Sequence, residues 1–306
     1  LSCLYALIIY LRKKCYQYGL LASYKSPLPV VVVGNITLGG TGKSPAVSYL
    51  VKSLQARGYR PGVVSRGYGA KVADTECREV LSTSLPSEVG DEPLMLKRRL
   101  SCPVYVSPNR KLSVQALEQQ GCDIVICDDG LQHYALQRDI EICVFDGERG
   151  LGNAWLLPTG PLRELPARMS SVDHLLVNGA DELAGYPQYE FIRMDLRAEN
   201  LVSLDGEMTS PLASLTGKKV NAVAAIGNPE RFFAVLESYG MILNRHAFED
   251  HHDYQQSDFN FSESLPLIMT EKDVVKCGDL KLPDAWYLPV EACLSRDLAE
   301  MIVKTL

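Results

Sequence analysis

Residues 30–44 read VVVVGNITLGGTGKS, an apolar run followed by a glycine-rich turn. Four consecutive β-branched valines, Val30 to Val33, are typical of a strand that is covered on both faces, as in a parallel sheet. Apolar residues then recur at helical spacing from Val47 to Leu54, and Gly58 closes that segment before a second strand pattern at 61–65. The stretch therefore predicts a strand, a loop, a helix and a second strand in succession.

The turn between this strand and helix ends in Gly-Thr-Gly-Lys-Ser, which is the pattern of a Walker A loop. Backbone N–H groups of such a loop face phosphate oxygens, and the helix N-terminus adds a favourable dipole. Thr37 occupies a position where the strict pattern has glycine, so the loop is a variant. A glycine-rich turn without nucleotide is the alternative, but this pattern between a strand and a helix rarely arises from packing alone.

The loop predicts a site for ATP and Mg²⁺. Lys43 is expected to bridge the β- and γ-phosphates of ATP, and the Ser44 hydroxyl to hold Mg²⁺. The expected nucleotide-binding residues are Gly39, Gly40, Thr41, Gly42, Lys43 and Ser44.

A second acidic element follows at 123–130, where the sequence DIVICDDG places two carboxylates at the end of an apolar strand pattern. This is typical of a Walker B segment, and one of Asp128 and Asp129 is expected to face Mg²⁺. Neighbouring side chains of a strand point to opposite faces, so the sequence leaves open which of the two it is. The alternative is a strand that ends in a purely structural Asp-Asp-Gly turn.

Strand patterns alternate with segments that fit crossover helices, which predicts an α/β fold with a P-loop NTPase-like parallel sheet. Short alternating runs at 189–210 then predict a β hinge or hairpin, and strand patterns at 220–227 and 267–270 predict a second, smaller α/β domain. The expected parts are an N-terminal helix at 1–26, a P-loop kinase domain at 27–195 and a smaller α/β domain with the hinge at 196–306.

Composition and net charge exclude several classes of function. The chain has 306 residues, of which 46% are hydrophobic, enough to fill a core. Its net charge of -6 argues against nucleic acid as a partner, because binding to a phosphate backbone normally needs a basic face. The nine cysteines form no Cys-x-x-Cys pair, which indicates reduced thiols in the cytoplasm rather than zinc ligands or disulfides.

The first eleven residues, LSCLYALIIYL, are apolar but too few for the roughly 20 residues of a membrane-spanning helix. Arg12, Lys13 and Lys14 follow directly, and tyrosines continue the segment. This pattern favours a helix that lies in a membrane interface. A signal peptide is excluded because the charges come after the apolar run, and a helix packed on the core is the remaining alternative.

Taken in order, the motifs from about residue 24 to residue 276 resemble those of the tetraacyldisaccharide 4'-kinase family. The resemblance implies transfer of the ATP γ-phosphate to the 4'-hydroxyl of tetraacyldisaccharide 1-phosphate, which forms lipid IVA in lipid A (lipopolysaccharide) biosynthesis. It also implies a peripheral or monotopic enzyme at the cytoplasmic face of the inner membrane, which we expect to be a monomer. The motifs are SRGYG at 65–69, GDEP at 90–93, DDGLQH at 128–133, LP at 157–158, GPLRE at 160–164, GNPERFF at 227–233, DHHDY at 250–254 and TEKD at 270–273.

The resemblance implies catalytic roles for Asp91, as the base that takes the hydroxyl proton, and for His251, which would orient that base and help to remove the proton. Spacing alone would make Asp91 a plain helix N-cap. For Lys272, which follows a predicted strand, only a nucleotide-facing or hinge role is considered.

Arg163 and Glu164 are expected near the nucleotide. Arg163 would stabilise charge that develops on the γ-phosphate, and Glu164 would join the Mg²⁺ ligands; the alternative is a solvated surface pair. Arg66 and Tyr68 are expected to contact the disaccharide phosphate, unless they belong to a glycine-bracketed turn without ligand. The expected catalytic residues are Asp91, His251, Lys43 and Arg163, and the expected metal ligands are Ser44, Asp128, Asp129 and Glu164.

Two other classes of protein share parts of this pattern. A P-loop NTPase that couples hydrolysis to a partner protein would have the same Walker elements and would need no lipid anchor. A membrane-associated, nucleotide-dependent scaffold would not need intact Lys43, Asp91, Asp128 and Asp129.

Overall fold

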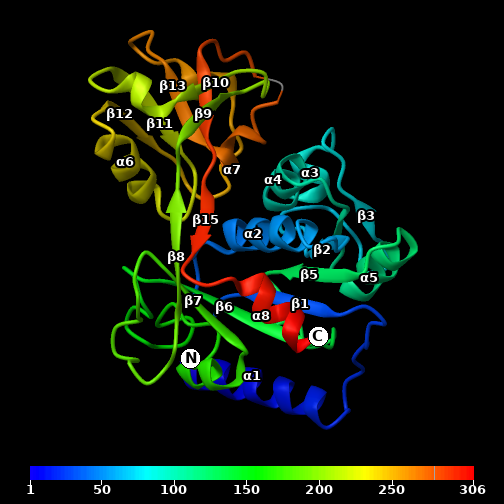
Figure 1. The fold of residues 1–306 in the computed structure, drawn as a ribbon. Helices are drawn as coiled ribbons and strands as arrows, with labels where there is room; N and C mark the ends of the chain where they lie inside the picture. Colours follow the sequence, from blue (N-terminus) through cyan, green and yellow to red (C-terminus); the bar gives the residue numbers. More distant parts are fainter. Residues whose placement is uncertain (279) are drawn as a thin grey trace. The chain divides into compact units, whose positions relative to one another are not determined.

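The computed structural model describes residues 1–278 and 280–306 and divides into two compact units (Figure 1). The larger unit comprises Leu1–Leu196 and Ala292–Leu306, and the smaller comprises Arg197–Glu291. The prediction of an α/β fold is confirmed. The sequence analysis gave every residue after 195 to the smaller domain, and for the last fifteen residues the structure differs. Strand β15 (Glu291–Leu294) lies beside β8 (Ile192–Arg197) in the sheet of the larger unit, and helix α8 (Leu298–Thr305) contacts α2 (Lys43–Gln55).

The larger unit is built on a nine-stranded sheet in the order β15-β8-β7-β6-β1-β5-β2-β4-β3. The strands from β8 to β4 in this order are paired in parallel, whereas β3 pairs antiparallel with β4. Its remaining strands are β1 (Val30–Gly34), β2 (Pro61–Ser65), β3 (Arg78–Glu79), β4 (Val104–Val106), β5 (Ile124–Asp128), β6 (Ile140–Asp146) and β7 (His174–Asn178).

Strand β1 lies at the centre of this sheet, and all five of its residues are buried, as its valine run predicts. It pairs with β5 on one side, where Val33 is opposite Asp128, and with β6 on the other. The carboxyl ends of parallel strands share one edge, which is where α/β sheets bind ligands. The glycine-rich turn and the two aspartates therefore meet at this edge. The other helical segments of the unit are α3 (Pro86–Val89), α4 (Asp91–Arg99), α5 (Arg110–Gln119) and the 3-10 turn η1 (Pro166–Ser171).

Helix α1 (Ser2–Gln17) has two apolar faces. Tyr5, Ala6 and Ile9 are partly buried against the core of the larger unit, and the Ser2 hydroxyl donates to the Leu156 carbonyl at 2.8 Å. The opposite face is exposed and carries Leu4, Leu7, Ile8 and Leu11. In the described parts of the chain, no helix is both long enough and apolar enough to span a membrane.

The smaller unit has a six-stranded sheet in the order β10-β9-β14-β13-β11-β12. Strands β14, β13, β11 and β12 are parallel, and β9 and β10 form an antiparallel hairpin, which is one of the two alternatives that the sequence left open. Its elements are β9 (Asn200–Ser203), β10 (Thr209–Pro211), η2 (Leu212–Leu215), β11 (Lys219–Ala224), α6 (Pro229–Ser238), β12 (Ile242–Ala247), η3 (Gln256–Phe259), β13 (Leu267–Thr270), α7 (Glu271–Val274) and β14 (Ala285–Leu288).

A buried carboxylate joins two of these elements. Asp273 in α7 is fully buried, and it accepts hydrogen bonds from the Ala225 backbone N–H at 3.0 Å and from the Thr270 hydroxyl at 2.6 Å. The ammonium of Lys276 lies 2.9 Å from its other oxygen. Asp273 therefore fixes the start of α7 to the end of β11.

We expect Asp273→Ala to lower the free energy of unfolding of the smaller unit by about 3–5 kcal/mol, because the variant leaves the buried Lys276 ammonium without a counter-ion. The chain has two tryptophans, so Trp155→Phe leaves Trp286 on β14 as the fluorescent reporter of this unit. Urea unfolding in that background measures the change.

Asp205→Ala, which removes an exposed carboxylate of the same unit, serves as the control and should cost less than about 1 kcal/mol. Adding Lys276→Met to Asp273→Ala should restore part of the loss, because the uncompensated charge is gone. A loss for Asp273→Ala as small as that of the control would mean that the buried pair does not hold this unit together.

Candidate active site

The glycine-rich loop runs from β1 into α2, with Gly42 as the N-cap of the helix. Gly42 has φ 100°, and a Cβ there would lie 2.8 Å from the Met194 methyl carbon and 3.0 Å from the Asn178 amide nitrogen. Only glycine fits both constraints. Among the described residues no side chain caps α2, so its first backbone N–H groups are available to an anion.

Two polar atoms of this loop are buried without a hydrogen-bond partner among the described residues: the Thr41 hydroxyl and the Asn35 side-chain oxygen. The Asn178 amide donates to the Thr41 carbonyl at 3.3 Å, and the Asn35 amide donates to the Gly39 carbonyl at 3.3 Å. Buried polar groups in proteins are normally paired. The open hydroxyl and the open helix N-terminus therefore fit a phosphorylated ligand in the loop.

Asp128 ends β5 and is 1% exposed. The Ser65 hydroxyl lies 3.5 Å from Oδ2, whereas Oδ1 has no hydrogen-bond partner among the described residues. Burial raises the pKa of this carboxyl to about 7, with smaller contributions from the nearby Glu92 and Asp129 charges, against the opposing effect of Lys43 and Arg110. A buried carboxylate with an open oxygen fits a divalent cation.

Asp129 has different surroundings. Its φ is 46°, in the left-handed region, and its carboxylate accepts two hydrogen bonds from one Arg163 nitrogen at 3.0 and 3.1 Å. The Lys43 ammonium lies 3.7 Å away. Burial alone would raise the pKa of Asp129, but the Lys43 and Arg163 charges outweigh it and lower the pKa. The structure thus distinguishes the two aspartates that the sequence left equivalent.

Arg110 holds the backbone of both aspartates, a role that the sequence analysis missed. It is the first residue of α5 and 2% exposed, and its guanidinium donates to the Asp128 carbonyl at 2.8 Å and to the Asp129 carbonyl at 2.9 Å. A second nitrogen lies 3.1 Å from the Cys127 sulfur. In the sequence, an arginine at a helix start has the pattern of a solvated charge, so no signal pointed to this contact.

The GDEP segment begins α4, next to the loop that follows β2. Gly90 is the N-cap with φ 91°, and a Cβ there would lie 2.8 Å from the Tyr68 carbonyl. Asp91 is the first helical residue, so the alternative of a plain N-cap aspartate is wrong. The Glu92 charge acts on the pKa of Asp128, which places a third carboxylate near this edge of the sheet. The sequence analysis did not assign Glu92 to the site.

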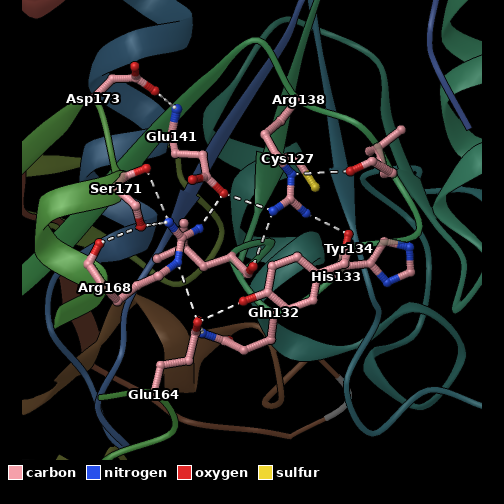
Figure 2. A network of polar contacts seen from close by, with 12 residues as sticks. Cys127, Gln132, His133, Tyr134, Arg138, Glu141, Glu164, Arg168, Ser171 and Asp173 are labelled. Carbon is pink, nitrogen blue, oxygen red and sulfur yellow. Dashed lines mark hydrogen bonds and ion pairs between the residues drawn. The ribbon is translucent and has the colours of Figure 1, made fainter. Parts of the chain in front are cut away.

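Arg163 and Glu164 are adjacent in sequence but contact different groups. Arg163 binds Asp129, whereas Glu164 is 7% exposed and belongs to the polar network drawn in Figure 2. One oxygen of Glu164 accepts from the Gln132 amide at 2.7 Å, and the other accepts from the Tyr134 hydroxyl at 2.7 Å and lies 3.3 Å from Arg168. Both oxygens are therefore engaged by the protein, which excludes a solvated surface pair. That Glu164 also joins the Mg²⁺ ligands stays a prediction.

The other predicted residues lie in two places. Arg66 and Tyr68 are exposed in the loop after β2. His251 belongs to the smaller unit, in the loop after β12, with φ 65°. Its cooperation with Asp91 remains a prediction. Among the described residues, no three His, Cys, Asp or Glu side chains are grouped so as to hold a metal ion.

A parallel sheet with a glycine-rich loop after its central strand, and acidic residues at the end of the neighbouring strand, defines a P-loop phosphotransferase or NTPase. The family model described as tetraacyldisaccharide-1-P 4'-kinase matches residues 1–306. The chain belongs to this family, and the resemblance seen in the motifs is confirmed.

Comparison with individual relatives gives the same family. The chain is 45% identical to a tetraacyldisaccharide 4'-kinase from Methylobacillus flagellatus over 307 residues, covering 100% of this chain and 90% of the relative. It is 46% identical to one from Pseudoalteromonas atlantica over 308 residues, covering 100% and 98%. A crystal structure of LpxK from Aquifex aeolicus in complex with ATP superposes with a TM-score of 0.79 at 30% identity, covering 99% of this chain and 96% of that one.

We expect Asp128→Asn to stabilise the protein without ligands, by an amount that grows between about pH 4 and about pH 7 and then levels off. The ordinary pKa of the group is 3.8, and burial raises it to about 7 in the folded state. Between these values the folded protein keeps a proton that the unfolded chain releases, so wild-type stability falls as the pH rises. Asparagine has no proton to lose. Thermal unfolding midpoints across this range measure the difference.

Asp123→Asn is the control, because Asp123 lies directly before the other end of the same strand and its side chain is 37% exposed. It should leave the pH dependence of the wild type in place. A constant offset between Asp128→Asn and wild type at every pH would show that Asp128 does not change its ionisation in this range.

Proposed function

We propose that this protein transfers the γ-phosphate of ATP to the 4'-hydroxyl of tetraacyldisaccharide 1-phosphate and so forms lipid IVA in lipid A biosynthesis. The proposal rests on the family match across all 306 residues, together with an intact phosphate-binding loop beside a buried carboxylate. A P-loop NTPase that drives a partner protein is less favoured, because the match extends through the smaller unit and its DHHDY loop, which the Walker elements alone do not need.

The loop from Gly39 to Ser44 is proposed to bind the phosphates of ATP. The Lys43 ammonium is balanced by Asp129 in the structure, so it is already held in the loop as a cation. On nucleotide binding, Lys43 would interact with the β- and γ-phosphates. Backbone N–H groups at the start of α2 and the buried Thr41 hydroxyl would supply further donors.

Ser44 and Asp128 are proposed to hold Mg²⁺, with Asp129 beside them. Asp128 is favoured as the carboxylate ligand because its Oδ1 is unpartnered among the described residues, whereas Asp129 is engaged by Lys43 and Arg163. Bound Mg²⁺ would neutralise phosphate charge during transfer. Glu164, which also pairs with Arg168, is proposed as a further carboxylate of this metal site.

Asp91 and His251 are proposed to serve the acceptor side. The Asp91 carboxylate accepts the proton of the 4'-hydroxyl as that oxygen bonds to the γ-phosphorus. The bond between this phosphorus and the β–γ bridging oxygen breaks, and ADP leaves with the electron pair. Arg163 is held at Asp129 and would stabilise the charge on the transferring group. His251 contributes from the smaller unit, as the family resemblance implies.

Helix α1 is proposed to bind the cytoplasmic surface of the inner membrane as a peripheral or monotopic anchor, in a monomeric enzyme. Its exposed apolar face repeats at helical spacing through Leu4, Leu7, Ile8 and Leu11. Lys14 lies 5.8 Å from the ring centre of Tyr10 and 5.6 Å from that of Tyr18, a basic and aromatic end that suits lipid headgroups. The opposite face is used for packing, so one helix would serve both purposes.

Asp91→Asn should lower kcat by on the order of 10²- to 10⁴-fold and leave ATP binding nearly intact, because a base acts in the transition state and not in holding nucleotide. Phosphorylation of tetraacyldisaccharide 1-phosphate in detergent micelles, with ATP and Mg²⁺, measures kcat. Titration with a fluorescent ATP analogue measures binding.

Lys43→Met is the reference for a failed phosphate site and should weaken ATP binding as well as turnover. Wild-type protein that hydrolyses ATP faster than it phosphorylates the lipid would favour the NTPase alternative. A folded Asp91→Asn enzyme with near-normal kcat would exclude Asp91 as the base.

Replacing Leu7 and Leu11 by Gln should reduce liposome binding by on the order of tenfold or more, because burying a leucine side chain contributes about 1.5–3 kcal/mol. The apparent KM for the lipid should rise and the KM for ATP should change little. Co-sedimentation with vesicles that contain anionic lipid measures the first effect.

A matched pair is available in the same unit, since Leu7 and Leu11 are 52% and 51% exposed and Leu81 and Leu85 are each 51% exposed. Replacing Leu81 and Leu85 by Gln should leave liposome binding unchanged. Equal behaviour of the two double variants would mean that α1 is an ordinary structural helix.

A further inference from the structure

Lys272 and His251 come together at one edge of the smaller sheet. His251 follows β12, and Lys272 follows β13 at the start of α7. Strand β11 pairs in parallel with both β12 and β13, so the carboxyl ends of these two strands share an edge. The sequence analysis considered Lys272 only for a nucleotide-facing or hinge role.

The Lys272 ammonium contacts two consecutive residues of the loop. It donates to the Asp250 carboxylate at 3.1 Å and lies 3.3 Å from Nε2 of His251. An ammonium has donors only, so Nε2 is the acceptor in this contact, and the neutral ring carries its proton on Nδ1. The Asp250 carboxylate oxygen lies farther from the same nitrogen, at 3.9 Å, so the closer Lys272 contact favours the Nδ1–H tautomer of His251.

The backbone on both sides of this contact is constrained. His251 has φ 65°, a left-handed conformation that is uncommon for residues other than glycine and costs free energy unless the surroundings hold it. Lys272 is carried by α7, which Asp273 fixes to the end of β11 and the Thr270 side chain caps. The Lys272 side chain is 15% exposed, and Asp250 balances its charge. A fixed cation therefore faces one ring nitrogen of an exposed histidine.

We propose that Lys272 is a positioning residue that holds His251 in the Nδ1–H tautomer, so that His251 offers a hydrogen-bond donor to the reaction and does not accept the hydroxyl proton. This deepens the proposed function: it rests on the participation of His251 given there, and it limits that role to orienting the base without taking up the proton. The proton of the acceptor hydroxyl then goes to the Asp91 carboxylate alone. Loss of the Lys272 ammonium would allow Nε2 of His251 to carry the ring proton in place of Nδ1. His251 would then still be present, but in the wrong tautomer.

The test uses long-range ¹H–¹⁵N NMR spectra of the full chain labelled with ¹⁵N-histidine, in mildly alkaline buffer where imidazole is neutral. The chain has five histidines, and the signals that disappear in His251→Gln identify His251. Wild-type protein should show a protonated Nδ1 and an unprotonated Nε2. Lys272→Met should move the proton toward Nε2 and lower kcat on the order of tenfold or more, with little change in the KM for ATP.

Two variants bracket this result. Lys272→Arg keeps a side chain that only donates, so it should retain the Nδ1–H signature and recover part of kcat. Lys219→Met removes a lysine from an exposed ion pair with Glu263 in the same unit and should leave both the His251 signals and kcat unchanged.

An unchanged His251 tautomer in Lys272→Met overturns the proposal. If the KM for ATP is raised at the same time, Lys272 is a nucleotide contact instead. A changed tautomer with unchanged kcat also overturns it, because the positioning would have no effect on turnover. In that case a large loss of kcat in His251→Gln would leave the proposed function intact, and a normal kcat in His251→Gln would show that the proposed role of His251 is wrong.

Discussion

The active edge of the larger unit depends on keeping the Asp128 carboxylate buried with one oxygen unpartnered among the described residues. Burial of such a group is unfavourable, as its raised pKa shows. None of the neighbouring described cations donates a hydrogen bond to this oxygen, so it stays available to a ligand. Lys43 and Arg163 are paired with Asp129, and Arg110 contacts the backbone carbonyls of both aspartates. The site thus retains a buried acid at some expense of stability, which is typical of functional positions.

A second set of buried charges links the chain segments that carry this site. Arg168 pairs with both Glu141 on β6 and Glu164, and Arg138 also contacts Glu141 (Figure 2). Gln132 and Tyr134, from the loop after β5, bind Glu164. The network therefore ties the loop that follows Asp129 to the segment that carries Arg163. Buried ion pairs contribute little net stability but favour one arrangement of the chain when every group is paired.

The sequence predicted those parts of the molecule whose structure is determined by neighbouring residues. Valine runs predict buried parallel strands because few other environments suit them, and the phosphate loop is a continuous motif. Contacts between distant residues could not be predicted in this way. Arg110 reaches Asp128 and Asp129 only after α5 has packed against β2 and β4, and nothing in its neighbouring residues reports this. The family resemblance implied roles for Arg163 and Glu164 near the nucleotide, but the contacts of Glu164 with Gln132 and Tyr134 have no signal in the neighbouring sequence.

The C-terminal segment is placed in the larger unit by the same kind of distant contact, since α8 lies against α2 and its N-cap Asp297 binds Arg57. The smaller unit is therefore an insertion, continuous from Arg197 to Glu291, between two segments of the larger unit. The smaller unit precedes β15 and α8 in the chain, so its residues leave the ribosome before those two elements do. Domains generally fold as units while the chain is being synthesised. Helix α2, which follows the phosphate loop, consequently acquires its neighbour α8 only after the whole smaller unit has been synthesised.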